Sequence, residues 1–289
     1  VLRDGCVKAS APKEEINISW IINHMTGGMN LENNDDEEHF LGKKYFEIKN
    51  VSLPKTGGGW VVNNVSFSLR RGEILGLYGL VGAGRSELFE CIIGARPEAS
   101  GTILIDDTPL HSKDIAGRIK DGIVLIPEDR QREGLIQNLS VQNNMTISSL
   151  EKFTKKFSLI KDKEEEAVRN CIQSLSIKTP STKSRIGALS GGNQQKVVIG
   201  KALLTEPKVL LMDEPTRGID VAAKKDVFKI IRDLAKRGLG IIIATSELKE
   251  VLAVSDRIIV LSRGKISGEF NRFEATEEKL IKAASATYV

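Results

Sequence analysis

Short apolar runs rich in β-branched residues recur along the chain, and they constrain the fold more than any other feature. Each has the length of a buried strand, as in EILGLYG, GIVLIP, VLLMD, GIIIAT and RIIVLS. Helix-prone segments separate most of these runs, and such an alternation is typical of a mostly parallel sheet. We therefore predict an α/β fold, and 289 residues suffice for one large core or two small ones.

Two regions depart from this alternation. Between residues 45 and 70, YFEIKNVSL and WVVNNVSFSL carry the period-two pattern of half-buried strands, which GTILIDD at 101–107 continues. Residues 130–185 are polar and helix-prone, and KDKEEEAVRNCIQSL within them has the pattern of an amphipathic helix. We expect an inserted helical subdomain at about 130–196, inside a domain that spans 45–289.

The start of the chain resembles a later part of it. VLRDGCVKAS at 1–10 is similar to VLSRGKISGE at 260–269, and five identities occur at this offset within the first 25 residues. We expect residues 1–25 to be the tail of a preceding homologous domain, and the glycine- and acid-rich residues 26–44 to be a linker. The alternative is a plain N-terminal extension.

Charge and composition exclude some classes of protein. The net charge is +4, from 42 basic and 38 acidic residues, which argues against a dedicated nucleic-acid binder. No apolar run approaches the ~20 residues of a membrane span, so work at a membrane would require docking to partners. The three cysteines form no CxxC pair, which is typical of a reducing, cytosolic environment.

GLVGAGRS at 79–86 has the spacing of a phosphate-binding P-loop between a strand and a helix. Its glycines let backbone N–H groups approach phosphates at a helix start, and Ser86 is the expected Mg²⁺ ligand. Arg85 stands where a lysine is usual, and its planar fork is not equivalent to an ammonium group. The segment expected to hold the nucleotide comprises Gly79, Leu80, Val81, Gly82, Ala83, Gly84, Arg85, Ser86 and Glu87.

VLLMDEP at 209–215 is an apolar run that ends in two carboxylates. Beside a P-loop, Asp213 would help hold Mg²⁺ through water and Glu214 would polarise the attacking water. Without the P-loop, the same letters would indicate only a strand followed by an acidic turn.

LSGGNQQKVVIGKALL at 189–204 offers a second anion cradle. Ser190, Gly191 and Gly192 supply a hydroxyl and exposed N–H groups at a helix start. One chain has little need of two phosphate cradles, but two domains that face each other head to tail can each complete the other's site. A P-loop kinase or GTPase lacks this segment and is excluded.

GLVGAGRS, LSGGNQQK, VLLMDEPTRGID and ATSELKE, in this order, resemble the nucleotide-binding domain of ABC-transporter ATPases, over about residues 45–270. GLVGAGRS and PEDRQREGL are similar to the C-terminal half of the tandem ATPase subunits that energise bacterial monosaccharide uptake. The resemblance implies a P-loop, RecA-like core, an N-terminal antiparallel β subdomain and the helical insertion. It implies a signature segment at Leu189, Ser190, Gly191, Gly192, Asn193 and Gln194, and a D-loop at Gly218, Ile219 and Asp220.

The resemblance also implies cofactors and partners. ATP and Mg²⁺ are the expected cofactors, and a preceding ABC domain of the same parent chain is the expected head-to-tail partner. Integral membrane permease subunits would hold the domain peripherally at the cytoplasmic face of the cell membrane, with a sugar-binding protein outside as an indirect partner. No nucleic-acid partner is expected.

Three positions depart from the family pattern. Arg85 replaces the P-loop lysine, Glu128 stands where a glutamine presents itself to Mg²⁺ and water, and Ser246 replaces the switch histidine. The chain's three histidines all precede residue 112, and loss of such a phosphate-contacting donor costs ~10²–10³ in rate. We predict ATP binding with slow or absent hydrolysis at this site, while the signature segment serves the partner's nucleotide.

Two questions stay open at this point. Trp60 is the expected adenine-stacking aromatic, and Tyr45 is the other upstream candidate. The chain could also be a non-hydrolysing regulatory module, or a soluble ABC ATPase of DNA repair or translation. Measurement of ATP turnover would separate the non-hydrolysing module from a transport ATPase. Turnover stimulated by nucleic acid would favour the soluble ATPase.

Overall fold

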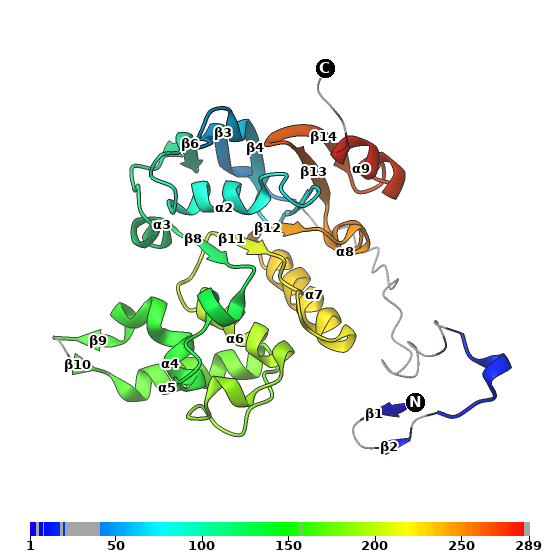
Figure 1. Ribbon diagram of the computed structural model, residues 1–289. Helices are drawn as coiled ribbons and strands as arrows, with labels where there is room; N and C mark the ends of the chain where they lie inside the picture. The colour runs from blue at the N-terminus through cyan, green and yellow to red at the C-terminus, as the bar shows by residue number, and fades with distance from the viewer. Residues whose placement is uncertain (4–5, 8, 18–19, 21–40, 157, 286–289) are drawn as a thin grey trace.

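A six-stranded sheet forms the centre of the computed structural model, which describes residues 1–3, 6–7, 9–17, 20, 41–156 and 158–285 (Figure 1). Five of its strands are parallel, and an edge strand, β14, runs antiparallel to its neighbour β13. In order across the sheet, the strands are β14 (Lys265–Asn271), β13 (Arg257–Ser262), β5 (Ile74–Tyr78), β12 (Gly240–Thr245), β11 (Val209–Asp213) and β8 (Ile123–Ile126). The predicted parallel core is confirmed.

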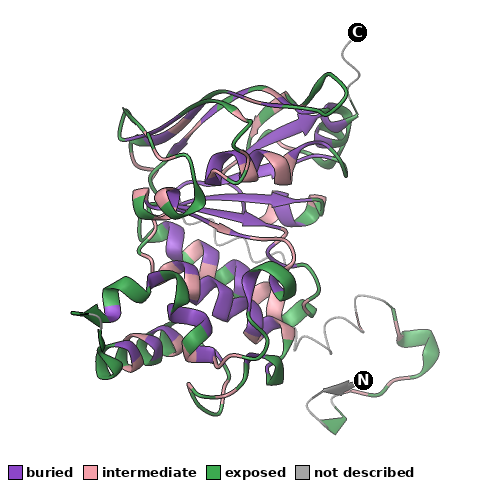
Figure 2. Ribbon diagram, turned by 60° about the vertical axis from the view of Figure 1, so that its left-hand side comes forward, coloured by how far each residue is buried: buried purple, intermediate pink, exposed green. Residues whose placement is uncertain are grey.

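A four-stranded antiparallel sheet and one helix cover one face of this core sheet. Helix α2 (Arg85–Ile93) packs between the two sheets, with Leu88 and Phe89 fully buried. The antiparallel strands, in order, are β4 (Trp60–Arg70), β3 (Lys44–Pro54), β6 (Ser100–Ile105) and β7 (Thr108–Pro109). Figure 2 shows the buried residues gathered between these layers.

Helices pack on the other face and at the ends of the core sheet. They are α3 (Ile115–Asp121), α7 (Val221–Lys236), α8 (Leu248–Val254) and α9 (Glu277–Ala284). Helix α7 shares its apolar face with the sheet through Val227, Phe228 and Ile231, which are all buried.

The helical insertion lies between β8 and β11. Its elements are η2 (Arg130–Gly134), α4 (Val141–Thr146), η3 (Ile147–Phe153), α5 (Lys161–Ser174), η4 (Ile186–Ala188) and α6 (Gly191–Leu203). A short hairpin, β9 (Thr154–Lys155) with β10 (Ser158–Leu159), interrupts the helices. Helix α6 continues to Leu203 and packs on the core, so the boundary expected at about residue 196 falls inside one helix.

Much of the predicted tail and linker at 1–44 lies outside the described residues. In the part that is described, β1 (Leu2–Arg3) pairs with β2 (Cys6–Val7), η1 (Lys13–Glu15) follows, and β3 already begins at Lys44. Among the described helices, none combines the length and the apolar character needed to cross a bilayer.

Tyr45 joins the antiparallel sheet to the core sheet. Its hydroxyl donates to the carbonyl of Lys208 and accepts from the N–H of Gly240 at 3.0 Å, and burial raises the pKa of Tyr45 to about 12. With only 3% of its surface exposed, Tyr45 is a core residue, so its candidacy for adenine stacking is wrong.

We expect Tyr45→Phe to lower the free energy of unfolding by about 1–3 kcal/mol, because it leaves a buried donor and acceptor without a partner. Urea unfolding would measure this, with Tyr78→Phe as the matched control. Tyr78 is equally buried, but its hydroxyl makes no hydrogen bond to the described residues. Equal losses in the two variants would contradict the bridging role.

Candidate nucleotide-binding site

The glycine loop at 79–84 joins the end of β5 to the start of α2. Gly82 and Gly84 have φ angles of 79° and 97°, in the left-handed region that favours glycine. A Cβ on Gly84 would lie 2.7 Å from the carbonyl oxygen of Val61, so only glycine fits there. No side chain caps α2, and the first N–H groups of a helix have no partners within the helix. The loop therefore presents backbone donors to an anion, as a phosphate cradle requires.

The other loop residues divide into two groups. Leu80 and Val81 are exposed, with Val81 at 93%, whereas Ala83 is buried and Gly79 packs against β13. Trp60, the predicted stacking residue, is half exposed and directly precedes Val61, whose carbonyl touches Gly84. The structure thus places an exposed tryptophan one residue from the backbone contact of the loop.

Asp213 and Ser86 come together as expected for a magnesium site. Asp213 ends β11 with 5% of its surface exposed, and the nearby Ser86 hydroxyl favours the charged form of its carboxylate. Burial raises the pKa of Asp213 to about 6; Arg85 acts in the opposite direction, and Glu214 and Glu87 add to the rise. A buried carboxylate beside a hydroxyl fits Mg²⁺, which is bound by few protein oxygens together with phosphates and water.

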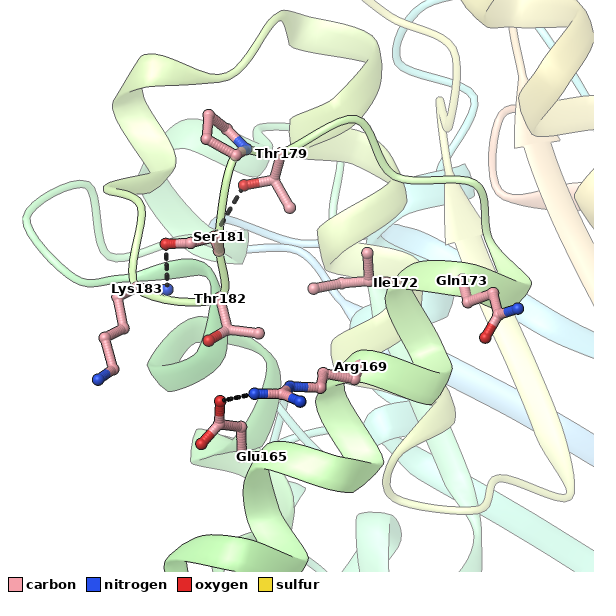
Figure 3. A pocket seen from close by; sticks show the side chains of 9 residues that line it. Glu165, Arg169, Ile172, Gln173, Thr179, Ser181, Thr182 and Lys183 are labelled. Atoms are coloured by element: carbon pink, nitrogen blue, oxygen red, sulfur yellow. Dashed lines mark hydrogen bonds and ion pairs between the residues drawn. The ribbon is translucent and has the colours of Figure 1, made fainter.

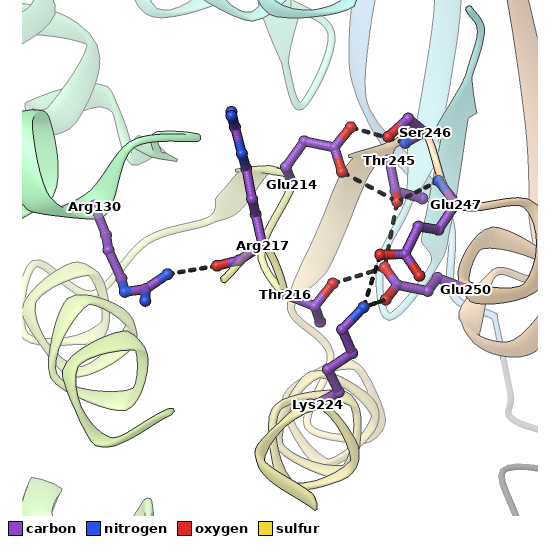
Figure 4. Close-up of polar contacts among 9 residues, drawn as sticks. All are labelled: Arg130, Glu214, Thr216, Arg217, Lys224, Thr245, Ser246, Glu247 and Glu250. Carbon is purple, nitrogen blue, oxygen red and sulfur yellow. Dashed lines mark hydrogen bonds and ion pairs between the residues drawn. The ribbon is translucent and has the colours of Figure 1, made fainter. Parts of the chain in front are cut away.

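Arg85 does not extend freely into the loop but pairs with Glu214. Its Nη1 lies 3.1 Å from Oε1 of Glu214, and both side chains are nearly buried, at 11% and 13% exposure. The N–H of Ser246 donates to the same oxygen at 2.8 Å, and Oγ1 of Thr245 lies 3.3 Å from Oε2 (Figure 4). The carboxylate predicted to polarise water is therefore engaged through both of its oxygens.

A second carboxylate, Glu250, extends this network (Figure 4). It accepts hydrogen bonds from Thr216 at 2.7 Å and from Lys224 at 2.8 Å, and Oγ1 of Thr245 lies 3.3 Å away. Thr245 has one proton and can donate to only one of the two carboxylates, Glu214 or Glu250. The network joins β11, β12, α7 and α8. The sequence analysis missed it, although ATSELKE places Glu250 one helical turn beyond Ser246.

Glu128 does not join the Ser86–Asp213 pair. It lies in the loop after β8 and forms an ion pair with Arg217. The charges that act on Asp213 are those of Arg85, Glu214 and Glu87. The role of Glu128 as a metal ligand therefore stays a prediction, since the guanidinium of Arg217 engages its carboxylate in this structure.

The predicted signature segment opens helix α6. Ser190 is exposed at the N-cap but does not cap the helix, since its Oγ accepts from Nδ2 of Asn193 at 2.9 Å. Side chains do cap other helices, namely α3, α4, α7 and α9. Gly192 packs against Ala223, leaving no room for a Cβ. The start of α6 is thus a second uncapped, glycine-rich helix N-terminus.

Two long side chains of this segment do not reach the surface. Leu189 and Gln194 are 8% and 6% exposed, and Nε2 of Gln194 donates to the carbonyl of Leu189 at 3.1 Å. They support the turn from within. In the predicted D-loop, Gly218 is exposed with a φ of 67°, and Asp220 caps α7 by accepting from the N–H of Ala223.

A separate cavity of about 520 Å³ lies in the helical insertion, between α5 and the loop at 179–183 (Figure 3). Arg169 and Glu165 form an ion pair along its wall. None of the predicted site residues lines it, so it is distinct from the nucleotide loops.

A family model described as ABC transporter matches residues 62–217, which is more than half of the chain and includes the P-loop and the Asp213–Glu214 pair. The chain belongs to the ABC transporter family. The family resemblance inferred from the sequence is thereby confirmed.

Curated relatives in this ABC transporter family extend beyond the chain. It is 42% identical over 287 residues to the xylose import ATP-binding protein XylG of Brucella abortus (strain 2308), covering 98% of this chain and 56% of that protein. It is 43% identical over 286 residues to the ribose import ATP-binding protein RbsA of Clostridium perfringens (strain 13 / Type A), with the same coverage. The chain thus spans about half the length of the curated relatives it matches.

A crystal structure of a nucleotide-free ATP-binding cassette from an ABC transporter has a similar fold. The TM-score is 0.70 at 25% identity, and the match covers 84% of this chain and 96% of that one. The predicted α/β fold, with its parallel core, antiparallel β subdomain and helices, is confirmed.

Proposed function

We propose that the chain is an ATP-binding domain of an importer for a monosaccharide such as xylose or ribose. The two import proteins that it resembles at 42% and 43% identity support the sugar class. The proposed partners are a preceding ABC domain in the same parent chain, membrane permease subunits at the cytoplasmic face and, indirectly, a sugar-binding protein outside. No nucleic acid takes part.

The residues of the glycine loop fit a nucleotide triphosphate. The uncapped start of α2 would bind phosphate oxygens through backbone N–H groups, and Trp60 would stack on the base. Ser86 and Asp213 would hold Mg²⁺, which neutralises phosphate charge when bound. Hydrolysis coupled to transport is the activity of this family. The rate of ATP hydrolysis at this particular site depends on Arg85 and Glu214.

The ion pair between Arg85 and Glu214 supports an asymmetric role. Phosphate oxygens and the Glu214 carboxylate compete for the same guanidinium, and Glu214 accepts further bonds from Ser246 and Thr245. A carboxylate satisfied in this way is a poor acceptor for a proton of water. We infer that this site binds ATP but hydrolyses it slowly, while the exposed start of α6 serves ATP on the partner domain.

The same ion pair also favours a second candidate, a regulatory module that binds nucleotide and never hydrolyses it. A soluble ABC ATPase without a membrane partner has no comparable support, because the relatives named above are import proteins.

Mg·ATP binding and turnover by the purified chain, beside a Glu214→Gln variant, would test this proposal. We expect the chain to bind Mg·ATP and to show no more turnover than the variant. Ser86→Ala serves as a second control and should weaken the Mg²⁺ dependence of binding. Hydrolysis that depends on Glu214 would mean that Arg85 releases this carboxylate, and the asymmetric role would be wrong.

A further inference from the structure

Arg130 is a buried cation that the expected ATP chemistry does not use. It begins η2, directly after the loop that carries Glu128, and only 8% of its surface is exposed. Nη1 donates to the carbonyl of Arg217 at 2.5 Å, and Nη2 donates to that of Gly218 at 3.0 Å (Figure 4 shows the first of these bonds). Gly218 is the first residue of the D-loop, and Arg217 directly precedes it.

The same guanidinium also contacts the signature segment. A Cβ built on Gly191, the first residue of α6, would lie 2.9 Å from Nη2 of Arg130 and 3.1 Å from the carbonyl oxygen of Gly218. Arg130 therefore fills the junction where the D-loop meets the start of α6, and the absence of a side chain at Gly191 makes room for it.

Burial of the Arg130 charge at this position lowers the stability of the folded protein. Within the described residues, Arg130 forms no ion pair, the nearby charge of Asp129 acts on it only through space, and its Nε has no hydrogen-bond partner. Burial lowers the pKa of Arg130, and the positive end of the α6 dipole lies beside it. Burial of a charge under these conditions is weak evidence for a stabilising role, so the contacts of Arg130 motivate a role in positioning.

The loop after β8 and the start of η2 contact Arg217 and Gly218 at two points. Glu128 pairs with the side chain of Arg217, while Arg130, two residues later, holds the backbone carbonyls of Arg217 and Gly218. A displacement of this loop would therefore move the D-loop and the start of α6 together.

We propose that Arg130 is a positioning residue that fixes the D-loop and the signature helix as one surface for the nucleotide of the partner domain. This inference rests on the proposed role of the signature segment in trans. It adds a residue and a mechanism: a buried guanidinium that sets the spacing between two backbone segments, without touching the nucleotide itself.

The test uses the intact parent subunit assembled with its membrane partners, and it measures kcat and KM for ATP per nucleotide-binding assembly. Arg130→Met removes the donors at similar length and should lower kcat about tenfold or more with little change in KM, because the displaced surface still binds nucleotide but misaligns it. Arg130→Lys, which retains a cationic donor, should restore part of the loss. Arg132→Met, on the same turn with 87% of its side chain exposed, should match the wild type.

Gly191→Ala should displace the same contact between Arg130 and the start of α6 from the other side. It replaces Arg130→Met in the test if that variant fails to assemble. It should show the same kcat defect, and the double variant should be no worse than either single one, because both act on one contact. A kcat within about twofold of wild type for both single variants would overturn the positioning role.

Ser190→Arg in the same assay separates the two proposals. If it abolishes turnover while Arg130→Met does not, only the positioning role fails. If Ser190→Arg leaves turnover unchanged, the signature does not act in trans, and both proposals fall.

Discussion

Ser190→Arg in the intact parent subunit is expected to lower ATP turnover by about 10²–10³-fold, whereas Glu214→Gln should lower it only slightly. Ser190 is exposed at the uncapped start of α6, where an arginine side chain would occupy the space that we propose for the partner's phosphates. Glu214 is already engaged by Arg85, Ser246 and Thr245, so neutralising it removes little activity.

Steady-state turnover of the two variants, measured at saturating ATP, decides the order of severity. Ser181→Arg is the matched control, because it adds the same side chain to an exposed serine of the helical insertion that belongs to none of the predicted site segments. A larger loss in Glu214→Gln than in Ser190→Arg would place most turnover on this chain's own P-loop and would contradict the asymmetric role.

Asp213→Asn should raise the free energy of unfolding at pH 7 by as much as about 3 kcal/mol when no nucleotide is bound. The pKa of Asp213 is about 6 in the folded protein, against 3.8 ordinarily, so folding is penalised once the carboxyl must ionise in its buried site. A tenfold change in proton affinity corresponds to about 1.4 kcal/mol, which sets the size of the effect. The penalty is absent below pH 4, grows between pH 4 and 6, and is complete above that window.

Urea unfolding of the variant and the wild type across this pH range would test the sign and the window. The difference between the two proteins should vanish near pH 4, and other titrating groups cancel in it. Asp107→Asn, at a side chain 84% exposed, should show no such pH-dependent gain. Mg·ATP should then stabilise the wild type more than the variant. A variant that is less stable at pH 7 would mean that burial does not strain this carboxyl.

The fold followed from local patterns. Apolar β-branched runs identified five strands of the core sheet, because residues buried on both faces leave a continuous apolar signature. The glycine loops were predictable for a similar reason: Gly84 needs a left-handed φ and a close approach to Val61, and a motif encodes both.

Side-chain partners did not follow from those patterns. The sequence offered Trp60 as the expected aromatic and Tyr45 as the other candidate, and only the packing of β3 on the core showed that Tyr45 is buried. The sequence predicted Glu128 as a metal ligand, but it could not predict the ion pair that Glu128 forms with Arg217, just before the D-loop. Arg130 is two residues further along, and its contacts to Gly218 and Gly191 join segments 60 or more residues away, a separation that no local pattern reveals.

Helix α6 connects the signature segment in the helical insertion to the hydrophobic core beside the central sheet. Its 13 residues span about 20 Å, with the signature segment at one end and residues such as Ile199 and Ala202 packed in the core near the other. A tilt of about 10° around the packed end would displace Ser190 by about 3 Å. That is the length of one hydrogen bond, so a small rotation of the helical insertion is enough to make or break contact with a nucleotide held by the proposed partner domain.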